Sequence, residues 1–396
     1  MNKFTLLATL YVAQFLPVAF FRQTFPVFLR QEGLSLETIG LTSLLSLPWT
    51  LKFIWSPLVD RYGWQKIGHY KSWILLMQAM LVLTICFCSF LDIQTNFKFL
   101  LGCLLFVTCF AATQDIATDA LAIKILSSGD RSFGNSIQVG ANYLGAMIGG
   151  GGILILLDRS GWNQSMLVMA LAIFLLSIPV IFYSEKSSIE PQEKERFNWL
   201  ALFNFYFIPG MWRWLLVLFL YMMGISMAWI MQYPMLVDLG ISLSEIGLMS
   251  GIVGFSAGLV GAFVGGLLIK PLGAKRSLIV FEILIAIAIA AWLLPTFGYT
   301  NLPLLYILSI AFQFAYSMAL IPMYSIMMDK SRIANPGSDF TLQVSLVFVG
   351  SYLTGSISGY IANWIGYRGV FALACVICWI AAVIVWQVFV LEKVVS

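Results

Sequence analysis

Charged residues are scarce in this chain. Only 10% of its 396 residues are Asp, Glu, Lys or Arg, whereas 60% are hydrophobic and the mean hydropathy is +0.92. This balance excludes an ordinary soluble domain, because no soluble core needs that much apolar surface. A bilayer does need it, since each spanning helix takes about 20 mostly apolar residues. The length therefore fits roughly a dozen membrane-spanning helices with short loops.

The chain also lacks the motifs of several other functions. It has one histidine, and its six cysteines all lie in apolar segments with no metal-type cluster of His or acidic residues beside them. We expect these cysteines to pack within helices. No Gly-x-x-x-x-Gly-Lys-Ser/Thr loop is present, so the sequence does not favour transport driven by ATP. No basic tail accompanies the net charge of +4, and we expect neither a nucleic-acid partner nor a cofactor.

Hydropathy divides the chain into two sets of six apolar segments. The first set comprises 4–28, 36–57, 72–91, 97–124, 132–157 and 163–183. The second set comprises 212–236, 244–269, 276–297, 302–328, 340–363 and 368–391. We therefore predict an N-terminal six-helix half (1–183), a cytoplasmic linker (184–211) and a C-terminal six-helix half (212–396).

Basic residues are distributed unequally between the two sides of these segments. Sixteen of the 22 Lys and Arg residues lie on one side, and two lie inside the spans. The four on the opposite side are Arg30, Lys98, Arg159 and Arg368. Because Lys and Arg concentrate in cytoplasmic loops, both termini and the linker are predicted to be cytoplasmic.

The two halves also match each other in sequence. Ser35–Leu41 (SLETIGL) returns 207 residues later as Ser242–Leu248 (SLSEIGL), and Asp329 follows Asp119 by 210 residues. Six helices per repeat leave both copies in the same orientation. The fold class is therefore predicted as all-α and integral to the membrane, with twelve transmembrane helices in two parallel repeats and the solute path between the halves.

The loop after the second segment carries a partial signature. Residues Ser56–Lys66 read SPLVDRYGWQK, with Asp60, Arg61 and Gly63 in the order of the major facilitator signature. The chain resembles that superfamily here, although a serine stands for the first glycine and a tryptophan for the first basic residue. The resemblance implies a gate, because an acid at a helix end beside a glycine turn and basic residues can hold the cytoplasmic side closed. An ordinary solvated loop is the alternative.

A narrower resemblance rests on three stretches of the first half. They are Leu47–Pro57 (LPWTLKFIWSP), His69–Trp73 (HYKSW) and Ala112–Ala120 (ATQDIATDA). They resemble the branch that contains muropeptide permeases, acetyl-CoA transporters and the siderophore permeases for rhizobactin and pyochelin, and are most similar to the siderophore permeases. This implies a secondary active transporter of the bacterial inner membrane that imports a bulky polar solute such as a siderophore. A muropeptide permease and a transporter of an acetyl-CoA-like anion are the alternatives.

Four charged side chains inside the spans need an explanation, because a charge in hydrocarbon costs about 2.5 to 3.5 kcal/mol on insertion scales. They are Arg22, Lys52, Asp115 and Asp119. The two acids stand four residues apart and so project from one helix face, where their repulsion suits a proton carrier. Lys52 lies at a comparable depth and can instead form a structural ion pair with one of them. Exposure of the acids at a helix end is a third interpretation.

Arg22 lies in the outer part of the first span, with Gln14 two helical turns earlier. Its planar guanidinium can bind a carboxylate or phosphate of the solute. Alternatively, the side chain can extend to the outer membrane surface.

Uncharged polar and aromatic residues in several spans complete the predicted substrate contacts. They are Gln114, Gln138, Asn142, Trp229, Gln232 and Tyr316. Amides in such positions more often form interhelical hydrogen bonds, whereas Trp229 can stack on an aromatic ligand. Glu282 and Asp329 are expected closer to water, as gate or structural charges. The glycine run 149–152 is expected to allow close helix approach.

Together these features predict proton-coupled import by alternating access. Asp115 or Asp119 takes the proton, and Arg22 or Lys52 helps to hold an anionic solute. The expected partners are a small-molecule solute, protons and the bilayer, and the chain is expected to act as a monomer. An intramembrane aspartyl enzyme is a rival class that we do not predict, because Ser325 stands where the second half would need an acid matching Asp115. A receptor that binds a ligand without moving it is the other rival.

Overall fold

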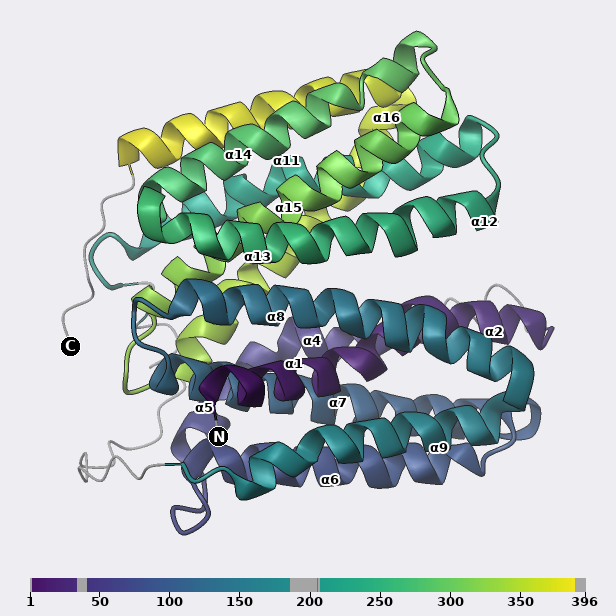
Figure 1. The fold of residues 1–396 in the computed structure, drawn as a ribbon, viewed down its shortest axis with the longest axis vertical. Helices are drawn as coiled ribbons and strands as arrows, with labels where there is room; N and C mark the ends of the chain where they lie inside the picture. Colours follow the sequence, from purple (N-terminus) through teal and green to yellow (C-terminus); the bar gives the residue numbers. More distant parts are fainter. Residues whose placement is uncertain (1, 34–40, 186–204, 206, 389–396) are drawn as a thin grey trace. The chain divides into compact units, whose positions relative to one another are not determined.

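A computed structural model describes residues 2–33, 41–185, 205 and 207–388. These residues form helices joined by short turns, and no strand occurs among them (Figure 1). The predicted all-helical architecture is therefore confirmed. Most of the predicted linker 184–211 lies outside the described residues, so the predicted division into halves stays a prediction.

The first predicted span is one continuous helical segment, whereas the second is broken. In the first, α1 (Lys3–Ala19) passes through a π-helical turn, η1 (Phe20–Thr24), into α2 (Phe25–Gln31). The second predicted span consists of four short pieces. Its first residues, 36–40, lie outside the described part of the chain. The pieces are η2 (Leu41–Ser46), α4 (Leu47–Leu51), η3 (Lys52–Ile54) and α5 (Ser56–Arg61).

The remaining elements of the first half are longer. They are α6 (His69–Ser89), α7 (Ile93–Ile125), α8 (Arg131–Gly145), the π-helical η4 (Ala146–Gly152) and α9 (Ile153–Phe182). The second half contains α11 (Met211–Asp238), α12 (Leu243–Ile246), the π-helical η5 (Gly247–Gly254), α13 (Phe255–Leu272), α14 (Ala274–Ala291), η6 (Leu294–Phe297), α15 (Leu302–Lys330) and α16 (Pro336–Val388).

Nine helical segments of the described chain are long and apolar enough to cross a membrane. Two of them have 52 residues and turn at a glycine with positive φ, Gly161 (φ 74°) and Gly366 (φ 68°), so each contains two predicted spans. The second predicted span corresponds to the shorter apolar segment Leu44–Ile54. All twelve predicted spans are therefore accounted for by helical segments.

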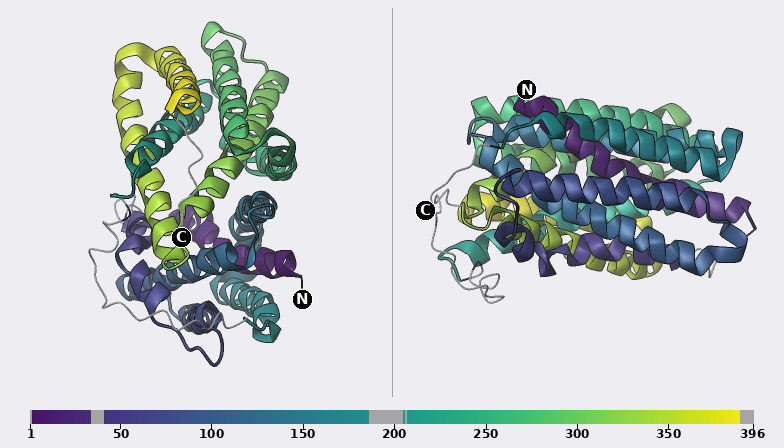
Figure 2. Two further views of the ribbon diagram at one scale, coloured as in Figure 1. Left: turned by 90° about the vertical axis from the view of Figure 1, so that its left-hand side faces the viewer. Right: turned by 90° about the horizontal axis from the view of Figure 1, so that it is seen from below.

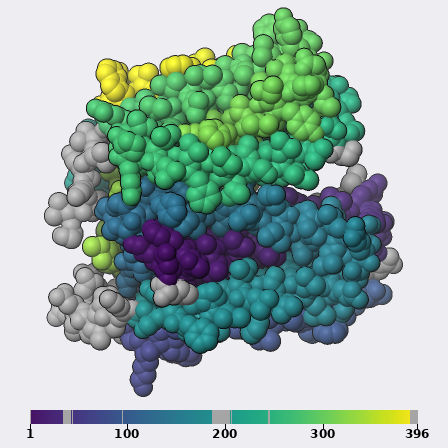
Figure 3. Space-filling model, viewed as in Figure 1, coloured from purple at the N-terminus to yellow at the C-terminus, as the bar shows by residue number. Residues whose placement is uncertain are grey.

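Contacts between Cα atoms divide the chain into two compact units. Unit 1 comprises Met1–Ser127, Ala141–Leu202 and Ser331–Thr341, and unit 2 comprises Ser128–Gly140, Phe203–Lys330 and Leu342–Ser396. Within unit 1, α6 packs against α7 and α9, and α1 packs against the same two helices (Figures 1 and 2). Side chains fill the space between α1 and α9 on the face shown in Figure 3.

Two buried apolar clusters lie along the same helices among the described residues of unit 1. One core contains Leu16, Trp49 and Ala112, and the other contains Leu10, Val59 and Ile116, each among further buried apolar residues. In α1, in the broken second span and in α7, the chain passes from one core to the other within a few residues. Polar side chains at this junction, between the two cores, are therefore surrounded by apolar groups on both sides.

The glycine run lies against α1. A Cβ atom added at Gly149 would collide with the backbone of Leu16, and one added at Gly145 would collide with Phe15. The Thr24 hydroxyl donates to the carbonyl oxygens of Gly149 and Gly150, which are accessible because neither residue has a side chain. The expected close approach of two helices at these glycines is confirmed.

A methyl group at Gly149 should destabilise the protein. Gly149→Ala must push α1 away from η4, and overpacking of this kind costs about 1 to 3 kcal/mol. Gly151→Ala is the matched control, because a Cβ there meets nothing within 4 Å. We expect a lower Tm in detergent for Gly149→Ala alone, and equal Tm values for the two variants would contradict the close approach.

Candidate functional site

Five polar side chains of unit 1 meet at the junction between its two cores. This charge cluster consists of Tyr11, Gln14, Lys52, Asp115 and Asp119. Lys52 Nζ donates to Asp115 Oδ2, and Gln14 Nε2 donates to Asp115 Oδ1. All three of these side chains are buried, with Lys52 only 1% exposed. The carboxylate of Asp115 is therefore held by a cation and an amide from two other helical segments.

Asp119 has a different partner. The Tyr11 hydroxyl donates to Asp119 Oδ1 at 2.9 Å, and Asp119 is 1% exposed. The predicted ion pair of Lys52 with one of the two acids is thus present, and it is formed with Asp115. The role of Tyr11 was not predicted, although it stands three residues before Gln14 and so lies on the same face of α1.

The break in the second span positions Lys52. The 3₁₀ turn η3 begins at Lys52, directly after α4, and the Lys52 ammonium lies 5.1 Å from the centre of the Trp49 ring. Trp55 Nε1 donates to Thr113 Oγ1 at 3.0 Å, which ties η3 to α7 near Asp115. A buried ion pair recovers the cost of desolvation only when its geometry is fixed by further contacts of this kind.

Two amide oxygens at the cluster have no hydrogen-bond partner in the described part of the chain. They belong to Gln14 and Gln114. Gln114 is next to Asp115 on α7, and its Nε2 donates to the Leu10 carbonyl at 3.4 Å. Unpaired buried acceptors are costly, and they are available to a proton donor on a solute, on water or on a protonated carboxyl group.

Asp60 of the signature loop binds the start of α16 within unit 1. Its carboxyl oxygens accept from the Gly337 N–H at 3.0 Å, the Ser338 N–H at 2.7 Å and the Ser338 hydroxyl at 2.6 Å. The Tyr70 hydroxyl donates to it at 2.9 Å. A carboxylate at a helix N-terminus is favoured by the helix dipole. Burial nevertheless raises the pKa of Asp60, and the hydrogen bonds oppose this only in part.

The other predicted gate residues have separate positions. Arg61 lies 5.9 Å from the Tyr62 ring centre, and a Cβ at Gly63 would collide with His69, so only glycine fits that turn. Asp329 forms an ion pair with Arg131 inside unit 2, and its side chain is 37% exposed, as expected for a charge near water.

Glu282 does not lie close to water, contrary to expectation. It is 0% exposed on α14, and no described basic side chain pairs with it. The sequence expectation placed Glu282 by counting helical turns from the start of the span. That count does not show how closely α14 follows α13, to which it is joined by the single residue Gly273.

The predicted substrate contacts are divided between the units. In unit 1, Arg22 lies on η1 and Asn142 on α8, and both are exposed, whereas Gln138 of unit 2 is buried on α8. The remaining contacts of unit 2 are Trp229, Gln232 and Tyr316, with Gln232 only 7% exposed.

Two of these unit 2 residues belong to an aromatic cluster, defined here as Trp229, Phe312 and Tyr316. The Trp229 and Tyr316 ring centres lie 4.8 Å apart, and the rings of Phe312 and Tyr316 are stacked at 6° with centres 6.3 Å apart. Phe312 was not predicted, although it stands four residues before Tyr316 on α15.

Breaking the ion pair from one side should cost more than removing it. Lys52→Met leaves the Asp115 carboxylate buried without its cation, a change that costs about 3 to 5 kcal/mol. The double variant Lys52→Met, Asp115→Asn removes both charges and should recover most of that loss. Thermal unfolding in detergent measures both, with exposed Lys66→Met as the control. Additive losses in the double variant would show that the two residues are not coupled.

The stability contributed by Asp60 should increase as the pH falls. A carboxyl group with a raised pKa binds its proton more tightly in the buried state, so acid favours the buried state and rising pH penalises it. Asp60→Asn is neutral at every pH. We expect the Tm of the wild type relative to this variant to rise as the pH falls toward about 4, the ordinary pKa of an Asp side chain. Exposed Asp158→Asn serves as the control, and a difference independent of pH would refute the linkage.

Comparison with known proteins identifies the family of this bundle. The model of the Major Facilitator Superfamily matches residues 7–335 and 214–395. An uncharacterized protein of Haemophilus influenzae is 29% identical over 366 residues, covering 89% of this chain and 86% of that protein. The anhydromuropeptide permease of Escherichia coli K12 is 27% identical over 369 residues, covering 89% of this chain and 72% of the permease.

Solved structures of low identity have the same fold. The transporter FucP in its outward conformation superposes with a TM-score of 0.72 at 16% identity, covering 98% of this chain and 99% of FucP. A bacterial homologue of ferroportin in an outward-facing state gives 0.70 at 14% identity, covering 98% and 99%. These likenesses support the predicted twelve-helix fold.

The relatives also bear on the narrower expectations. The permease of Escherichia coli supports the muropeptide alternative, and the expected siderophore similarity is not supported. The matching family is one of transporters, and the Escherichia coli relative is a permease, so this chain is a multi-pass membrane protein that transports a small solute and is not an enzyme. By its match over most of its length and by its helical architecture, the chain belongs to the Major Facilitator Superfamily.

Proposed function

We propose that this protein imports a muropeptide-like solute across the bacterial inner membrane together with protons, which move inward down their gradient. The observation that carries the proposal is the buried charge cluster on a chain that is 27% identical to an anhydromuropeptide permease over 89% of its length. A purely structural cluster would need no second acid beside Asp115. Both termini are proposed to be cytoplasmic and the protein to be a monomer.

Asp115 and Asp119 are proposed as the proton-coupling residues. Protonation of Asp115 would neutralise the acceptor of Lys52 and free that ammonium for an anionic group of the solute. Asp119 lies one turn away on α7 and accepts a hydrogen bond from Tyr11. It would receive the proton from Asp115, or it would be the protonated acid when the transporter opens to the opposite side of the membrane. Two acids one helical turn apart, only one of which is paired with a cation, can both ionise only at a cost, which links the occupancy of the site to the proton gradient.

Solute contacts are proposed in both units. A muropeptide combines sugar rings with carboxylates, so it needs flat apolar surfaces and basic groups. The aromatic cluster of unit 2 offers the first, with Gln232 and its unpaired Nε2 one turn beyond Trp229. Exposed Arg22 in unit 1 offers the second. The further amides Gln114, Gln138 and Asn142 remain proposed contacts for the polar groups of such a solute.

Gating is proposed at the loop of Asp60, Arg61 and Gly63. The hydrogen bonds from Gly337 and Ser338 join this loop to the start of α16, and alternating access would require them to break and reform. Asp329 is a second proposed gate residue, whose ion pair with Arg131 would break and reform in the same way. Glu282, which is buried in unit 2, is the third.

Uptake by purified protein in liposomes tests the function. With an imposed inward proton gradient, we expect a labelled anhydro-muropeptide to accumulate and the accumulation to collapse when a protonophore is added. A labelled ferric siderophore is the comparison solute, because siderophore import is the second candidate. Accumulation of the ferric chelate alone would overturn the muropeptide assignment and leave the transport mechanism intact.

The same assay tests the coupling residues. Asp115→Asn and Asp119→Asn should abolish uphill uptake, whereas downhill exchange of the solute across the membrane continues. Asp158→Asn, an exposed acid, should transport as the wild type does. Full gradient-driven accumulation in both cluster variants would remove the proton role from these residues.

A further inference from the structure

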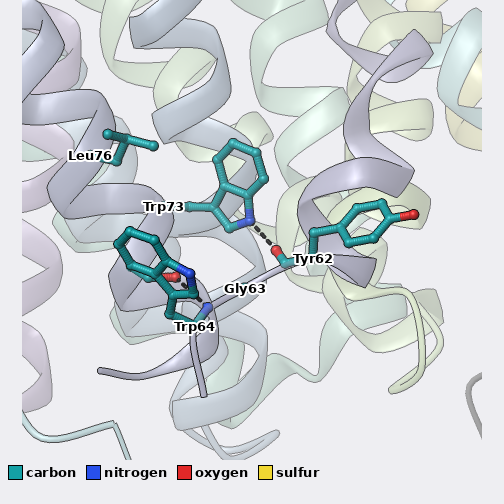
Figure 4. A pocket seen from close by; sticks show the side chains of 6 residues that line it. Tyr62, Gly63, Trp64, Trp73 and Leu76 are labelled. Carbon is teal, nitrogen blue, oxygen red and sulfur yellow. Dashed lines mark hydrogen bonds between the residues drawn. The ribbon is translucent and has the colours of Figure 1, made fainter. Parts of the chain in front are cut away.

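A pocket of about 290 Å³ lies in unit 1 outside the charge cluster. This loop pocket is lined by Tyr62, Gly63, Trp64, Ser72, Trp73 and Leu76 (Figure 4). It is formed between the loop that follows α5 and the first turns of α6. Its volume is at the lower end of the range for sites that bind small molecules. Proton coupling and solute binding, as proposed above, use none of its tryptophans.

Two hydrogen bonds hold the walls of the loop pocket together. Trp73 Nε1 donates to the Tyr62 carbonyl oxygen, and the Trp64 N–H donates to Ser72 Oγ at 3.1 Å (Figure 4). Gly63 can carry no side chain, because of His69. The loop is therefore fixed against α6 before any ligand arrives, and the pocket is preformed.

The walls are aromatic and unusually exposed. Trp64 is 70% exposed and Tyr62 is 54% exposed. Exposed tryptophan is unfavourable in water, but Trp and Tyr are favoured at the level of the lipid headgroups, where one end of the ring is apolar and the other polar. The loop pocket thus has the composition of the membrane interface.

An apolar stripe continues from the pocket along α6. Leu76, Met80, Leu83 and Phe87 are 49%, 37%, 64% and 50% exposed. Their spacing of four, three and four residues places them on one face of the helix. The other sides of α6 pack on α7 and α9. Because Leu76 belongs to both the pocket and this α6 stripe, an acyl chain in the pocket can continue along the helix into the hydrocarbon.

The pocket segment itself carries only basic charges, although the Glu185 carboxylate reaches it and accepts from the Lys71 N–H at 2.9 Å. Residues 61–73 contain Arg61, Lys66 and Lys71 and no acid. The Lys71 ammonium is bound to the carbonyl oxygens of Ile181 and Tyr183, whereas Lys66 is an exposed side chain two residues after Trp64. A basic side chain near a membrane surface attracts anionic lipid headgroups.

We infer that the loop pocket binds one anionic phospholipid of the adjacent leaflet. Its glycerol and upper acyl chain would lie between Trp64 and Trp73, its chain would follow the α6 stripe, and its phosphate would lie near Lys66. The site is independent of the transported solute. Because the loop of the pocket directly follows Asp60 and Arg61 at the end of α5, the bound lipid braces the proposed gate.

Lipid binding to the purified full-length protein tests this inference. Native mass spectrometry after delipidation would compare phosphatidylglycerol with phosphatidylcholine of the same acyl chains. We expect one phosphatidylglycerol to be retained about fivefold more tightly than phosphatidylcholine, which is the effect of one basic side chain at a membrane surface. Lys66→Gln should remove this preference, and Trp64→Ala should remove retention of both lipids.

Two control variants match the tested ones. Trp364→Ala removes a tryptophan that is 91% exposed and does not line the loop pocket, and Lys270→Gln removes an exposed lysine at the end of α13. Trp64 is itself mostly exposed, so its removal leaves the helix packing intact. Equal retention of both lipids by the wild type and by Trp64→Ala would indicate only annular lipid and overturn the inference. Displacement of the lipid by free glycerol phosphate at equal concentration would also overturn it.

Discussion

The arrangement of unit 1 depends on one ion pair inside an apolar bundle. Neither Lys52 nor Asp115 can remain charged in hydrocarbon alone, so the helices that carry them must bring them together. Gln14 adds α1 to the same point. Three segments that are distant in sequence therefore meet at a fixed rotation about their axes. Apolar packing alone would fix that rotation less strictly, because a Leu or Val side chain packs acceptably in several orientations.

The two cores of unit 1 lie on either side of this point. One holds the aromatic residues near Trp162, and the other holds smaller aliphatic residues such as Ala117 and Ala120. A transporter that alternates between two states needs a region that can change while its surroundings stay packed. A polar junction between two rigid cores has this property, since protonation changes its charge without changing its volume.

The positions of the spans could be predicted from sequence, but their internal breaks could not. Hydropathy is averaged over about 19 residues, so it locates a helix such as α6 and is blind to a change of helical pitch within it. Pro48 and Pro57 lie in the first turns of α4 and α5 and help to divide the second span, but an average over hydropathy does not register them. The π-helical turns η1 and η4 lie at contacts between helices. Thr24 bonded to Gly149 is one such contact, and it joins residues 125 apart.

The candidate site was predictable in part for a similar reason. A lysine and two acids in hydrocarbon must find partners, so a pair involving Lys52 followed from the sequence. The choice of Asp115 over Asp119 did not, because the two acids share one face of α7 and a small rotation decides between them. Tyr11 was not predicted, because a tyrosine in a span carries no charge. Glu282 was expected near water, because the neighbours that bury it are remote in sequence.

The ion pair also has a consequence for biosynthesis, because its two residues are synthesised at different times. Lys52 and Asp115 are separated by 63 residues, and a ribosome that adds about 5 to 20 residues per second needs roughly 3 to 13 seconds to cover them. During that interval the second span enters the membrane with its lysine still lacking a carboxylate. The position of Lys52 near one end of that span lets its ammonium reach the headgroup region while it waits. The nascent chain can thus postpone the desolvation of its first buried charge until the helix that neutralises it has been made.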